Sequence, residues 1–240
     1  MTIYAVGDIH GQIEMLTWAL DLIKADGGDD AEIVFLGDLV DRGANSRKVI
    51  ELLMSGQADG KRWHVLKGNH DRIFERFVDH GFQYDPRIKS GLGWLDRRMG
   101  GIETLASYGV TGAQDPATDE VQQAARAAVP QAHLDFLQAM PLWLQRGELL
   151  FVHAGIRPGV PLEQQTEEDL IWIREPFLIE ALPHPWLIVH GHTALDYPQH
   201  FGNRIDLDGG AGYGRPIIPA VFEGRNCWLL GDQGREALLP

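Results

Sequence analysis

The chain has 240 residues, of which 44% are hydrophobic and 23% are charged, and it contains one cysteine, Cys227. This composition excludes wholesale disorder, and a single cysteine excludes an internal disulfide framework. The formal net charge of −13 argues against a protein that binds duplex DNA, because phosphate contacts along DNA need clustered Lys and Arg. A phosphate ester at a local site stays open, since bound cations can reverse the field there.

The N-terminal residues lack the basic start, long apolar stretch and small-residue cleavage site of a signal peptide. No apolar run approaches the roughly 20 residues that a membrane-spanning helix needs. Residues capable of chemistry begin as early as Asp8. We therefore expect a cytoplasmic protein, with neither a membrane nor a nucleic acid as its partner.

The first third of the chain alternates predicted strands and helices. Apolar runs at 3–6, 33–36 and 63–66 predict buried strands. Apolar residues at helical spacing predict helices over 15–23 and 49–53. Strands that alternate with helices form a parallel sheet, and ligands bind beyond the carboxyl ends of its strands. Asp8, Asp38 and Asn69 follow those ends.

The rest of the chain is less regular. Residues 118–140 are rich in Ala, Gln and Leu and are predicted to be helical. We expect one domain over 1–240, with a helical insert at about 80–141 beside the site. Strands are predicted at 149–152 and 186–189, and antiparallel strands at 204–207, 217–222 and 226–230. Four tryptophans are predicted to lie in the core: Trp18, Trp63, Trp143 and Trp186.

Groups that can bind metal follow each of the predicted strands. Gly-Asp-Ile-His-Gly occupies 7–11, Gly-Asp-Leu-Val-Asp-Arg-Gly occupies 37–43 and Gly-Asn-His-Asp occupies 68–71, and His153 and His192 follow later. Oxygen and nitrogen ligands without thiolate suit Mn²⁺, Fe or Zn²⁺ better than a structural zinc site. So many ligands indicate two metal ions that share one carboxylate, a recurrent device for attack at phosphorus.

Together and in this order, these motifs resemble the calcineurin-like metallophosphoesterases, and the Val-Asp-Arg-Gly form resembles their phosphoprotein phosphatase branch. The small bacterial and bacteriophage-lambda-type Ser/Thr protein phosphatases are the most similar group. The Asp206-Leu207-Asp208-Gly209-Gly210 segment resembles the closing strand and turn of the family. The resemblance implies a four-layer α/β/β/α sandwich and metal-dependent hydrolysis of phosphoserine or phosphothreonine, with phosphotyrosine as a further substrate.

The resemblance also implies the ligands of two divalent ions, with Mn²⁺ preferred and Fe or Zn²⁺ as alternatives. Asp8, His10 and Asp38 would hold the first ion. The second would be held by Asp38, Asn69, His153 and His192, so that Asp38 bridges the pair. A metal-bound hydroxide would then attack the phosphorus of a phosphoprotein or a small phosphoester.

Four further residues receive roles from the same resemblance. His70 would protonate the leaving oxygen, and Asp41 would orient the His70 ring and favour its charged form. Arg42 and Arg174 would bind the non-bridging phosphate oxygens, a task that suits a planar guanidinium.

Departures from the family pattern leave an alternative open. Lys67 precedes Gly-Asn-His where many members have Arg, and a lysine cannot make the same forked contact with phosphate. Asp71 replaces the Glu of the eukaryotic phosphatases and is also seen in the symmetrical diadenosine tetraphosphate hydrolases, which are the alternative. Those hydrolases tend to have Ala where this chain has Asp41, and this difference favours the protein phosphatase interpretation.

Several residues also allow a structural interpretation. Asp8 and His10 could form a strand-end turn and helix cap, Asp41 and Arg42 a surface ion pair, and Arg174 a salt bridge with Glu175 or Glu168. His153 and His192 could be core histidines. His190 could be structural or a metal ligand, and Tyr213 could lie over the site or pack within its own turn. Cys227 is expected to be an inert buried thiol and not a nucleophile. The whole chain could also be a binding protein that has lost turnover.

Overall fold

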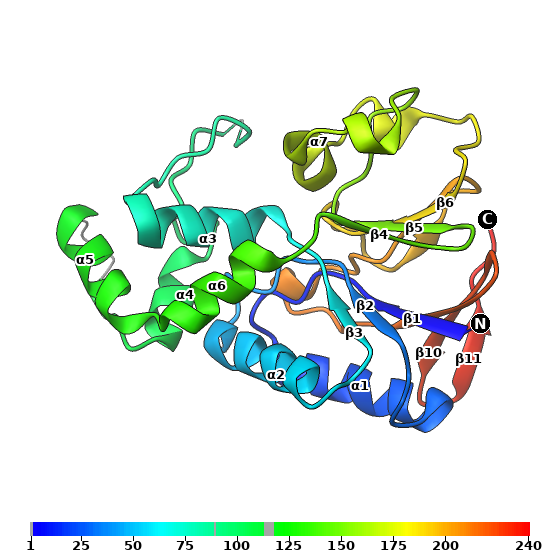
Figure 1. Ribbon diagram of the computed structural model, residues 1–240, viewed down its shortest axis with the longest axis horizontal. Coiled ribbons are helices and arrows are strands. Elements are labelled where there is room, and N and C mark those ends of the chain that lie inside the picture. The colour runs from blue at the N-terminus through cyan, green and yellow to red at the C-terminus, as the bar shows by residue number, and fades with distance from the viewer. Residues whose placement is uncertain (1, 89, 113–117) are drawn as a thin grey trace.

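Two β-sheets packed face to face form the centre of the protein, with helices on both outer sides (Figure 1). The computed structural model describes residues 2–88, 90–112 and 118–240. The first sheet has the strand order β11-β10-β9-β1-β2-β3, and the second has the order β4-β5-β6-β8-β7. The predicted α/β sandwich is therefore confirmed.

The first sheet begins with the predicted parallel strands β1 (Thr2–Val6), β2 (Ile33–Phe35) and β3 (Trp63–Val65). They are joined by α1 (Ile13–Gly27) and α2 (Ser46–Ala58), which cover the outer face of the sheet (Figure 1). Three antiparallel strands extend it on the other side: β9 (Ala220–Glu223), β10 (Asn226–Gly231) and β11 (Gly234–Ala237). The parallel strands are buried on both faces, which explains their continuous apolar runs.

The second sheet contains β4 (Trp143–Arg146), β5 (Leu149–Val152), β6 (Leu187–His190), β7 (Gln199–His200) and β8 (Arg204–Asp206). The prediction of three antiparallel strands in the tail is correct only in part for the first of them. β8 is antiparallel to β7 but parallel to β6, and it does not pair with β9, because the chain crosses to the other sheet before β9. A pattern of apolar residues cannot distinguish these arrangements, since a strand of either kind can be buried on both faces.

Two hydrophobic clusters lie on the two faces of the first sheet, because successive side chains of a strand point to opposite faces. Ile3 and Ala5 of β1 belong to the cluster between the sheets, where Phe151 and Phe222 meet edge to face at 5.8 Å. Tyr4 and Val6 belong to the cluster beneath the helices. Truncating a buried phenylalanine such as Phe151 to alanine costs about 3–5 kcal/mol of stability.

The tryptophan prediction is correct only in part. Trp63 is buried and Trp186 is partly buried against the core. Trp18 and Trp143 are each 37% exposed, so their assignment to the core was wrong. Trp143 lies on β4, an edge strand with alternating exposed and half-buried residues.

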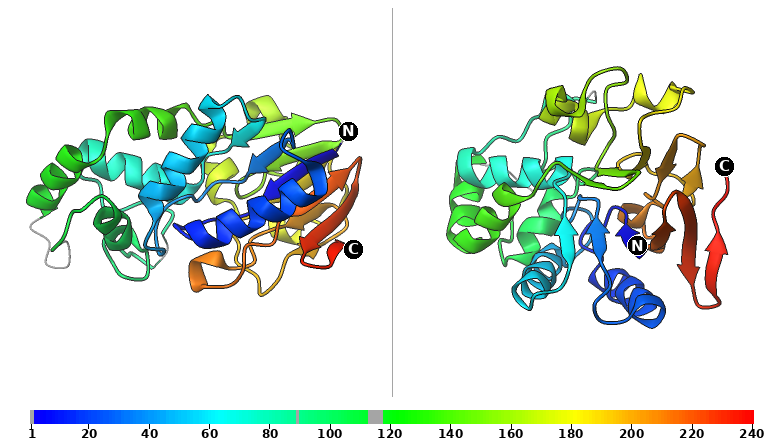
Figure 2. Two further views of the ribbon diagram at one scale, coloured as in Figure 1. Left: turned by 90° about the horizontal axis from the view of Figure 1, so that it is seen from below. Right: turned by 45° about the vertical axis from the view of Figure 1, so that its right-hand side comes forward.

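A group of helices lies at the end of the molecule opposite the two chain termini (Figure 2). It comprises α3 (Asn69–His80), α4 (Gly101–Ser107), α5 (Thr118–Ala128) and α6 (Gln131–Ala139). The predicted helical region 118–140 is divided at Pro130, which lacks the N–H that a continuous helix would need there. Of these helices, α3 packs against both α5 and α6.

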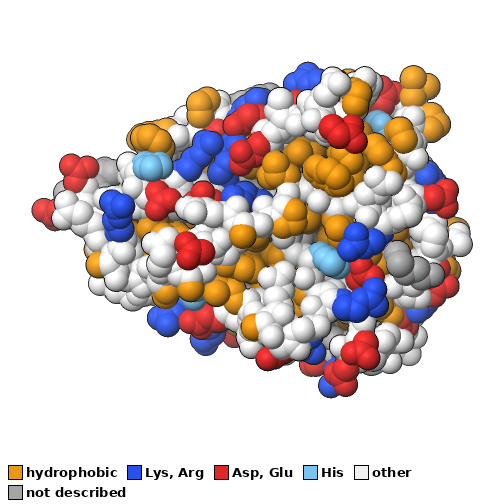
Figure 3. Space-filling view, viewed as in Figure 1, with side chains coloured by type: hydrophobic (Ala, Val, Ile, Leu, Met, Phe, Trp, Pro, Cys, Tyr) orange, Lys and Arg blue, Asp and Glu red, His pale blue; other side chains and the backbone are white. Residues whose placement is uncertain are grey.

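Short elements complete the side of the second sheet: η1 (Leu162–Gln164), α7 (Glu167–Trp172) and η2 (Phe177–Ile179), with η3 (Ala211–Tyr213) near the strand ends. None of the helices described is long and apolar enough to cross a membrane. On the face shown in Figure 3, acidic and basic side chains are interspersed, so no continuous basic surface of the kind that DNA binding needs is seen there.

Candidate metal centre

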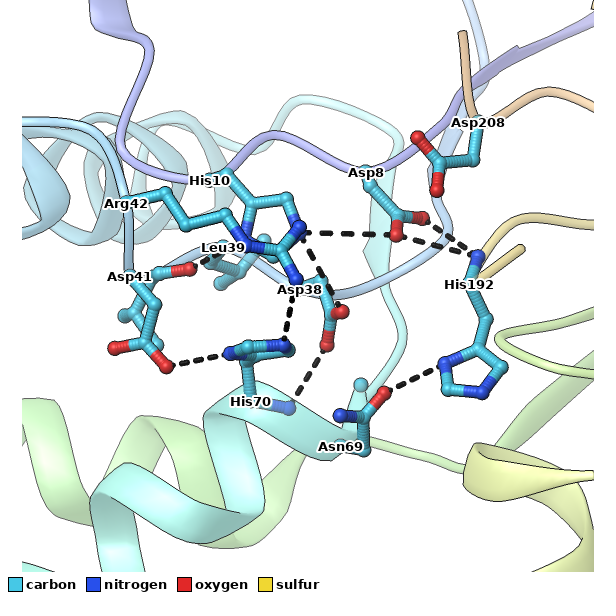
Figure 4. A network of polar contacts seen from close by, with 12 residues as sticks. Asp8, His10, Asp38, Leu39, Asp41, Arg42, Asn69, His70, His192 and Asp208 are labelled. Carbon is cyan, nitrogen blue, oxygen red and sulfur yellow. Dashed lines mark hydrogen bonds and ion pairs between the residues drawn. The ribbon is translucent and has the colours of Figure 1, made fainter. Parts of the chain in front are cut away.

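The carboxyl ends of strands from both sheets meet at one place, and the predicted ligands lie there. Asp8 follows β1, Asp38 follows β2 and Asn69 begins α3 directly after β3. His153 follows β5, and His192 follows β6 in the second sheet. Figure 4 shows Asp8, Asp38, Asn69 and His192 turned toward a common centre. The arrangement follows from the parallel strands, whose carboxyl ends share one edge.

Two buried triads offer ligand atoms that lie within 4.8 Å of one another: His10, Asp38 and His70, and Asp38, His153 and His192. Asp38 belongs to both triads. Its Oδ1 lies 3.4 Å from His153 Nε2 and its Oδ2 lies 3.7 Å from His10 Nε2. The carboxylate of Asp38 thus reaches both triads, which is the geometry that a bridging ligand requires.

The charge of Asp38 is stabilised by its surroundings. Burial raises the pKa of a carboxyl group, but His153, His70 and His10 outweigh that effect and lower the pKa of Asp38 to about 2. Its Oδ1 also accepts a hydrogen bond of 2.9 Å from the backbone N–H of His70. Gly68 is required beside it, because a Cβ at that position would lie 2.1 Å from the same oxygen.

The three imidazoles expected to bind metal are buried, and burial favours their neutral form. Burial is the main reason that the pKa values of His10, His153 and His192 lie below the ordinary value. His10 Nδ1 donates to Val40 O at 2.8 Å and His153 Nδ1 to Leu36 O at 2.9 Å, so both Nε2 atoms keep a lone pair. A neutral ring with one nitrogen fixed in this way is the form that binds a metal ion.

Asn69 and His192 complete the second triad. Asn69 Oδ1 lies 2.8 Å from His192 Nδ1 and 3.0 Å from His153 Nε2. The Nδ1 of His192 is therefore the ring nitrogen that faces Asn69 and the centre (Figure 4). Carboxylate, amide and imidazole groups that converge in this way are a donor set that divalent cations such as Mn²⁺, Fe or Zn²⁺ bind. The residues present therefore fit a pair of divalent cations.

Asp8 adds a carboxylate to this centre. Its two oxygens accept from the backbone N–H of His192 at 3.1 and 3.2 Å. Burial, followed by the charges of Asp208 and Asp38, raises its pKa well above the usual range. A Cβ on Gly191 would lie 2.1 Å from Asp8 Oδ1. Carboxylates crowded together in a buried place need a positive charge between them, as a metal site provides.

Asp208 is a residue that the sequence motifs did not assign to the site. It is buried, lies next to Asp8 (Figure 4) and lines the same cavity. Its Oδ1 accepts a hydrogen bond of 2.9 Å from Gly210 N–H. In the sequence, Asp208 could have been recognised from the Asp-Leu-Asp-Gly-Gly segment, which resembles the family's closing turn.

His70 and Asp41 form a buried pair in which the Nδ1 of His70 lies 2.6 Å from Oδ2 of Asp41. Because Asp41 is the acceptor, the Nδ1 of His70 carries the proton. Burial lowers the pKa of His70, but the Asp38 charge and the Asp41 hydrogen bond outweigh it, so the pKa is raised overall. A ring held in this way can donate a proton near neutral pH.

Arg42 points into the centre. Its Nη1 lies 2.8 Å from His10 Nε2 and its Nη2 lies 3.3 Å from His70 Nε2. In the described part of the chain, Asp41 pairs with His70 and not with Arg42. The alternative of a surface Asp41–Arg42 ion pair is therefore wrong.

A cavity of about 810 Å³ opens from this centre. Its polar wall includes four arginines: Arg42, Arg87, Arg157 and Arg174. Arg174 is exposed, and its Nη2 lies 3.5 Å from the carbonyl oxygen of His192. Glu168, one of the partners considered for Arg174, instead binds Arg72 at 2.8 and 3.0 Å. The ring of Tyr213 also lines the cavity, with the Arg42 guanidinium 5.0 Å from its centroid.

Three residues that the sequence analysis considered, Lys67, His190 and Cys227, do not line the cavity. Lys67 is buried and pairs with Glu75 at 3.0 Å. His190 is engaged at both ring nitrogens, with Gly191 O 3.0 Å from Nδ1 and Arg204 Nη1 3.1 Å from Nε2. This geometry favours the structural interpretation of His190. Burial raises the pKa of the Cys227 thiol to about 12, so it is unsuited to act as a nucleophile.

Known proteins share this sequence pattern and this fold. The family model described as calcineurin-like phosphoesterase matches residues 1–214. A bis(5'-nucleosyl)-tetraphosphatase PrpE [asymmetrical] of Geobacillus thermodenitrificans is 25% identical over 239 residues, which cover 89% of this chain and 87% of that protein. A symmetrical bis(5'-nucleosyl)-tetraphosphatase of Janthinobacterium sp. is 31% identical over 159 residues, covering 66% and 45% of the two chains.

Two crystal structures are similar to this chain in fold. One, provisionally described as that of a diadenosine tetraphosphatase, has a TM-score of 0.66 and 21% identity, and the match covers 95% of this chain and 92% of that one. The other is a cold-active protein-tyrosine phosphatase of a Shewanella species, with a TM-score of 0.64 and 17% identity, covering 99% and 80%.

Proposed function

This chain belongs to the calcineurin-like phosphoesterase family, and from that premise we propose that it hydrolyses dinucleoside polyphosphates. The coarser activity is that of a metal-dependent phosphoesterase, for which the residues of the two buried triads other than His70 supply ligands, since His70 is assigned as the proton donor. The proposed substrate class differs from the one that the sequence motifs favoured. Dinucleoside polyphosphates, the alternative in the sequence analysis, now come before phosphoproteins.

The observation that carries this proposal is the arginine-lined cavity beside the triads. A phosphomonoester has one phosphate group, which Arg42 and Arg174 could bind at the centre itself. Arg87 and Arg157 line the cavity beyond it, where Arg157 is paired with Asp169 at 2.8 Å and Arg87 lies 3.6 Å from Glu168. A chain of several phosphates would use these further guanidinium groups, since each can bind phosphate oxygens with two parallel hydrogen bonds. The names of the similar tetraphosphatases agree with such a substrate.

The residues of the site suit this chemistry. Asp8, His10, Asp38, Asn69, His153 and His192 would hold two divalent ions. When bound, these ions would provide Lewis-acid activation of the phosphate and of the attacking water. Arg42 and Arg174 would orient the non-bridging oxygens of the phosphate under attack. His70 would donate the proton from its Nε2 to the leaving oxygen, while Asp41 holds its Nδ1–H.

A Ser/Thr protein phosphatase is the second candidate, and the Asp41–His70 pair favours it. An alkoxide leaving group needs a proton more than a leaving phosphate does, since the alkoxide is far more basic. The 2.6 Å hydrogen bond between Asp41 and His70 would supply a well-oriented donor for such a group.

Hydrolysis of competing substrates tests the proposal. Protein stripped of metal and then loaded with Mn²⁺ is given diadenosine tetraphosphate or a phosphothreonine peptide, and kcat/KM is measured for each. We expect the dinucleotide to be preferred by at least about 10-fold, a difference of 1.4 kcal/mol in transition-state stabilisation. Chromatography of the products gives the cleavage position, since ATP with AMP indicates asymmetric cleavage and two ADP indicate symmetric cleavage.

The variant His70→Ala serves as the control for contaminating activity, with an expected rate loss on the order of 10²–10⁴, the usual contribution of a general acid. Preference for the phosphopeptide would overturn the proposal in favour of the second candidate. Hydrolysis of neither substrate by metal-loaded protein would leave the binding-protein interpretation.

A further inference from the structure

Two residues that follow α3 in the chain, Trp94 and Thr104, contact Asp41, the hydrogen-bond partner of the proton donor His70. Thr104 lies in α4 and is fully buried. Its Oγ1 accepts a hydrogen bond of 2.8 Å from the backbone N–H of Asp41, and it donates one of 2.7 Å to Asp41 Oδ1. One hydroxyl thus holds both the main chain and the side chain of the same residue, across 63 positions of sequence.

Trp94 holds the other oxygen of this carboxylate. Its indole Nε1–H donates to Asp41 Oδ2 at 2.9 Å, and the same Oδ2 accepts from His70 at 2.6 Å. The Trp94 ring is fully buried against Phe74 and Phe77, with centroid distances of 5.7 and 4.7 Å. The indole N–H therefore has a fixed direction.

The backbone of Asp41 also needs support. Asp41 and Arg42 have φ angles of 74° and 65°, in the left-handed region that residues with a Cβ disfavour. Gly100, which lies between Trp94 and Thr104, accepts a hydrogen bond of 3.3 Å from the Arg42 N–H. A Cβ on Gly100 would lie 2.0 Å from that nitrogen, so the close approach requires glycine.

We propose that Thr104 and Trp94 are positioning residues, which orient the Asp41 carboxylate and through it the proton-donating ring of His70. Rotation of an aspartate carboxylate about its last bond has a broad energy well. Hydrogen bonds from two buried donors, one to each oxygen, fix the plane of that carboxylate, and His70 then has a single orientation for its bond to Oδ2. The inference depends on the proposed role of His70 and not on the identity of the substrate.

Three substitutions separate this role from general stability. Thr104→Val removes the hydroxyl at nearly constant shape, and Thr104→Ser restores it. Trp94→Phe removes the indole N–H but keeps an aromatic ring against Phe74 and Phe77. The matched control is Tyr108→Phe, which removes another buried hydrogen bond of this region, the one of 2.9 Å from Tyr108 Oη to His133 Nδ1, without touching Asp41.

The first readout needs no metal and no turnover. In the ¹H NMR spectrum of metal-free protein, the His70 Nδ1–H in its short bond to a carboxylate should give a low-field resonance that is absent in His70→Ala. We expect Thr104→Val and Trp94→Phe to shift or broaden this resonance. Thr104→Ser and Tyr108→Phe should leave it in place. An unchanged resonance in both Thr104→Val and Trp94→Phe would overturn the inference.

The second readout compares two aryl esters that differ in leaving-group basicity, p-nitrophenyl phosphate and phenyl phosphate, with Mn²⁺-loaded protein. Misplaced proton donation should lower kcat for phenyl phosphate about 10-fold more than for p-nitrophenyl phosphate, because the more basic phenolate needs the proton. Tyr108→Phe should leave the ratio of the two rates unchanged. Equal losses for both esters in Thr104→Val would contradict a positioning role.

The two proposals fail in different ways. If diadenosine tetraphosphate is not cut but the resonance and the ester ratio change as expected, the positioning role stands and the substrate proposal falls. If the dinucleotide is cut and neither readout changes, the positioning role falls alone.

Discussion

The carboxylate of Asp71 accepts a hydrogen bond of 2.9 Å from the backbone N–H of Asp38 through its Oδ2. Its Oδ1 accepts from Leu39 N–H, also at 2.9 Å. The first turn of α3 thus fixes the backbone of the loop after β2 with two hydrogen bonds. One of them is made to Asp38, whose side chain reaches both triads. Asp38 has a φ of 51°, so this support acts on an unfavourable backbone conformation.

Replacing Asp71 with Asn should weaken both the fold and the metal centre. An amide has one acceptor oxygen, so at least one buried backbone N–H loses its partner, at a cost of about 1–3 kcal/mol. Metal affinity should fall by roughly 10–100-fold, as it does when groups that orient a metal ligand are lost. Urea unfolding of metal-free protein and calorimetric titration with Mn²⁺ measure the two effects. Asp79→Asn is the control and should alter neither, because the half-buried Asp79 near the end of α3 accepts from a side chain, Gln138 Nε2 at 3.1 Å, and not from the loop after β2.

His192→Ala should reduce the number of bound metal ions from two to one. Its Nδ1 lies 2.8 Å from Asn69 Oδ1, and loss of this ring leaves the second triad with one ligand fewer. Titration with Mn²⁺ followed by electron paramagnetic resonance should show two interacting ions in the unmodified protein and an isolated ion in the variant. His80→Ala, at the exposed end of α3, should keep both ions. Retention of two coupled ions in His192→Ala would remove His192 from the ligand set.

Arg174→Ala should impair a polyphosphate substrate and a simple ester alike, because Arg174 is assigned to the phosphate under attack. A guanidinium bound to phosphate contributes about 1.5–3 kcal/mol, so its loss should raise KM by roughly 10–100-fold for both diadenosine tetraphosphate and p-nitrophenyl phosphate. Arg225→Ala, which lines a different cavity, is the matched control. A rise in KM for the dinucleotide alone would assign Arg174 to a further phosphate of the chain.

Stability at high pH should depend on Tyr4. Burial, with the nearby Asp26 carboxylate, raises the pKa of the Tyr4 hydroxyl to about 12, and its Oη donates to Asp26 Oδ2 at 2.6 Å. The unfolded chain loses this proton above its ordinary pKa of about 10, while the folded chain keeps it. The stabilisation is therefore complete below pH 10 and is lost as the pH rises toward 12.

The measurement is the free energy of unfolding in urea, between pH 8 and pH 12, for metal-free wild-type protein and for Tyr4→Phe. The difference between the two curves isolates Tyr4 from the other groups that titrate in this range. The difference in the free energy of unfolding between the wild-type protein and Tyr4→Phe should narrow steadily above pH 10. A constant difference would show that the Tyr4 hydroxyl titrates alike in the folded and unfolded states.

The architecture could be predicted because its central strands are buried on both faces. Such strands leave continuous apolar runs, and the polar residue that ends each run must then lie at one edge of the sheet. The amino-acid pattern alone is enough to place Asp8, Asp38 and Asn69 together. The roles assigned to these residues come from the family resemblance, and they stay predictions until the metal centre is measured.

The missed features have physical reasons of their own. β7 contains only Gln199–His200, too short for a periodic pattern, and every residue of β11 (Gly234–Ala237) is exposed. Thr104 and Trp94 belong to no motif, and their contacts to Asp41 arise only when α4 packs beneath the loop after β2. Asp71 is recognisable in the sequence as a departure that leaves the subfamily open, but its bonds to backbone N–H groups cannot be inferred from residue type.

The contact of Trp94, Gly100 and Thr104 with the Asp41–Arg42 turn has a consequence for how such proteins diversify. A peripheral segment beside an active site is ordinarily free to be exchanged, which alters substrate choice while the reacting groups stay intact. Here the same segment also supplies bonds to those groups. A graft that replaces residues 94–104 would have to reproduce an indole, a glycine and a hydroxyl at the same places. New specificity is therefore acquired more easily at Arg157 and Arg174, which line the cavity from the chain between β5 and β6, than in this segment.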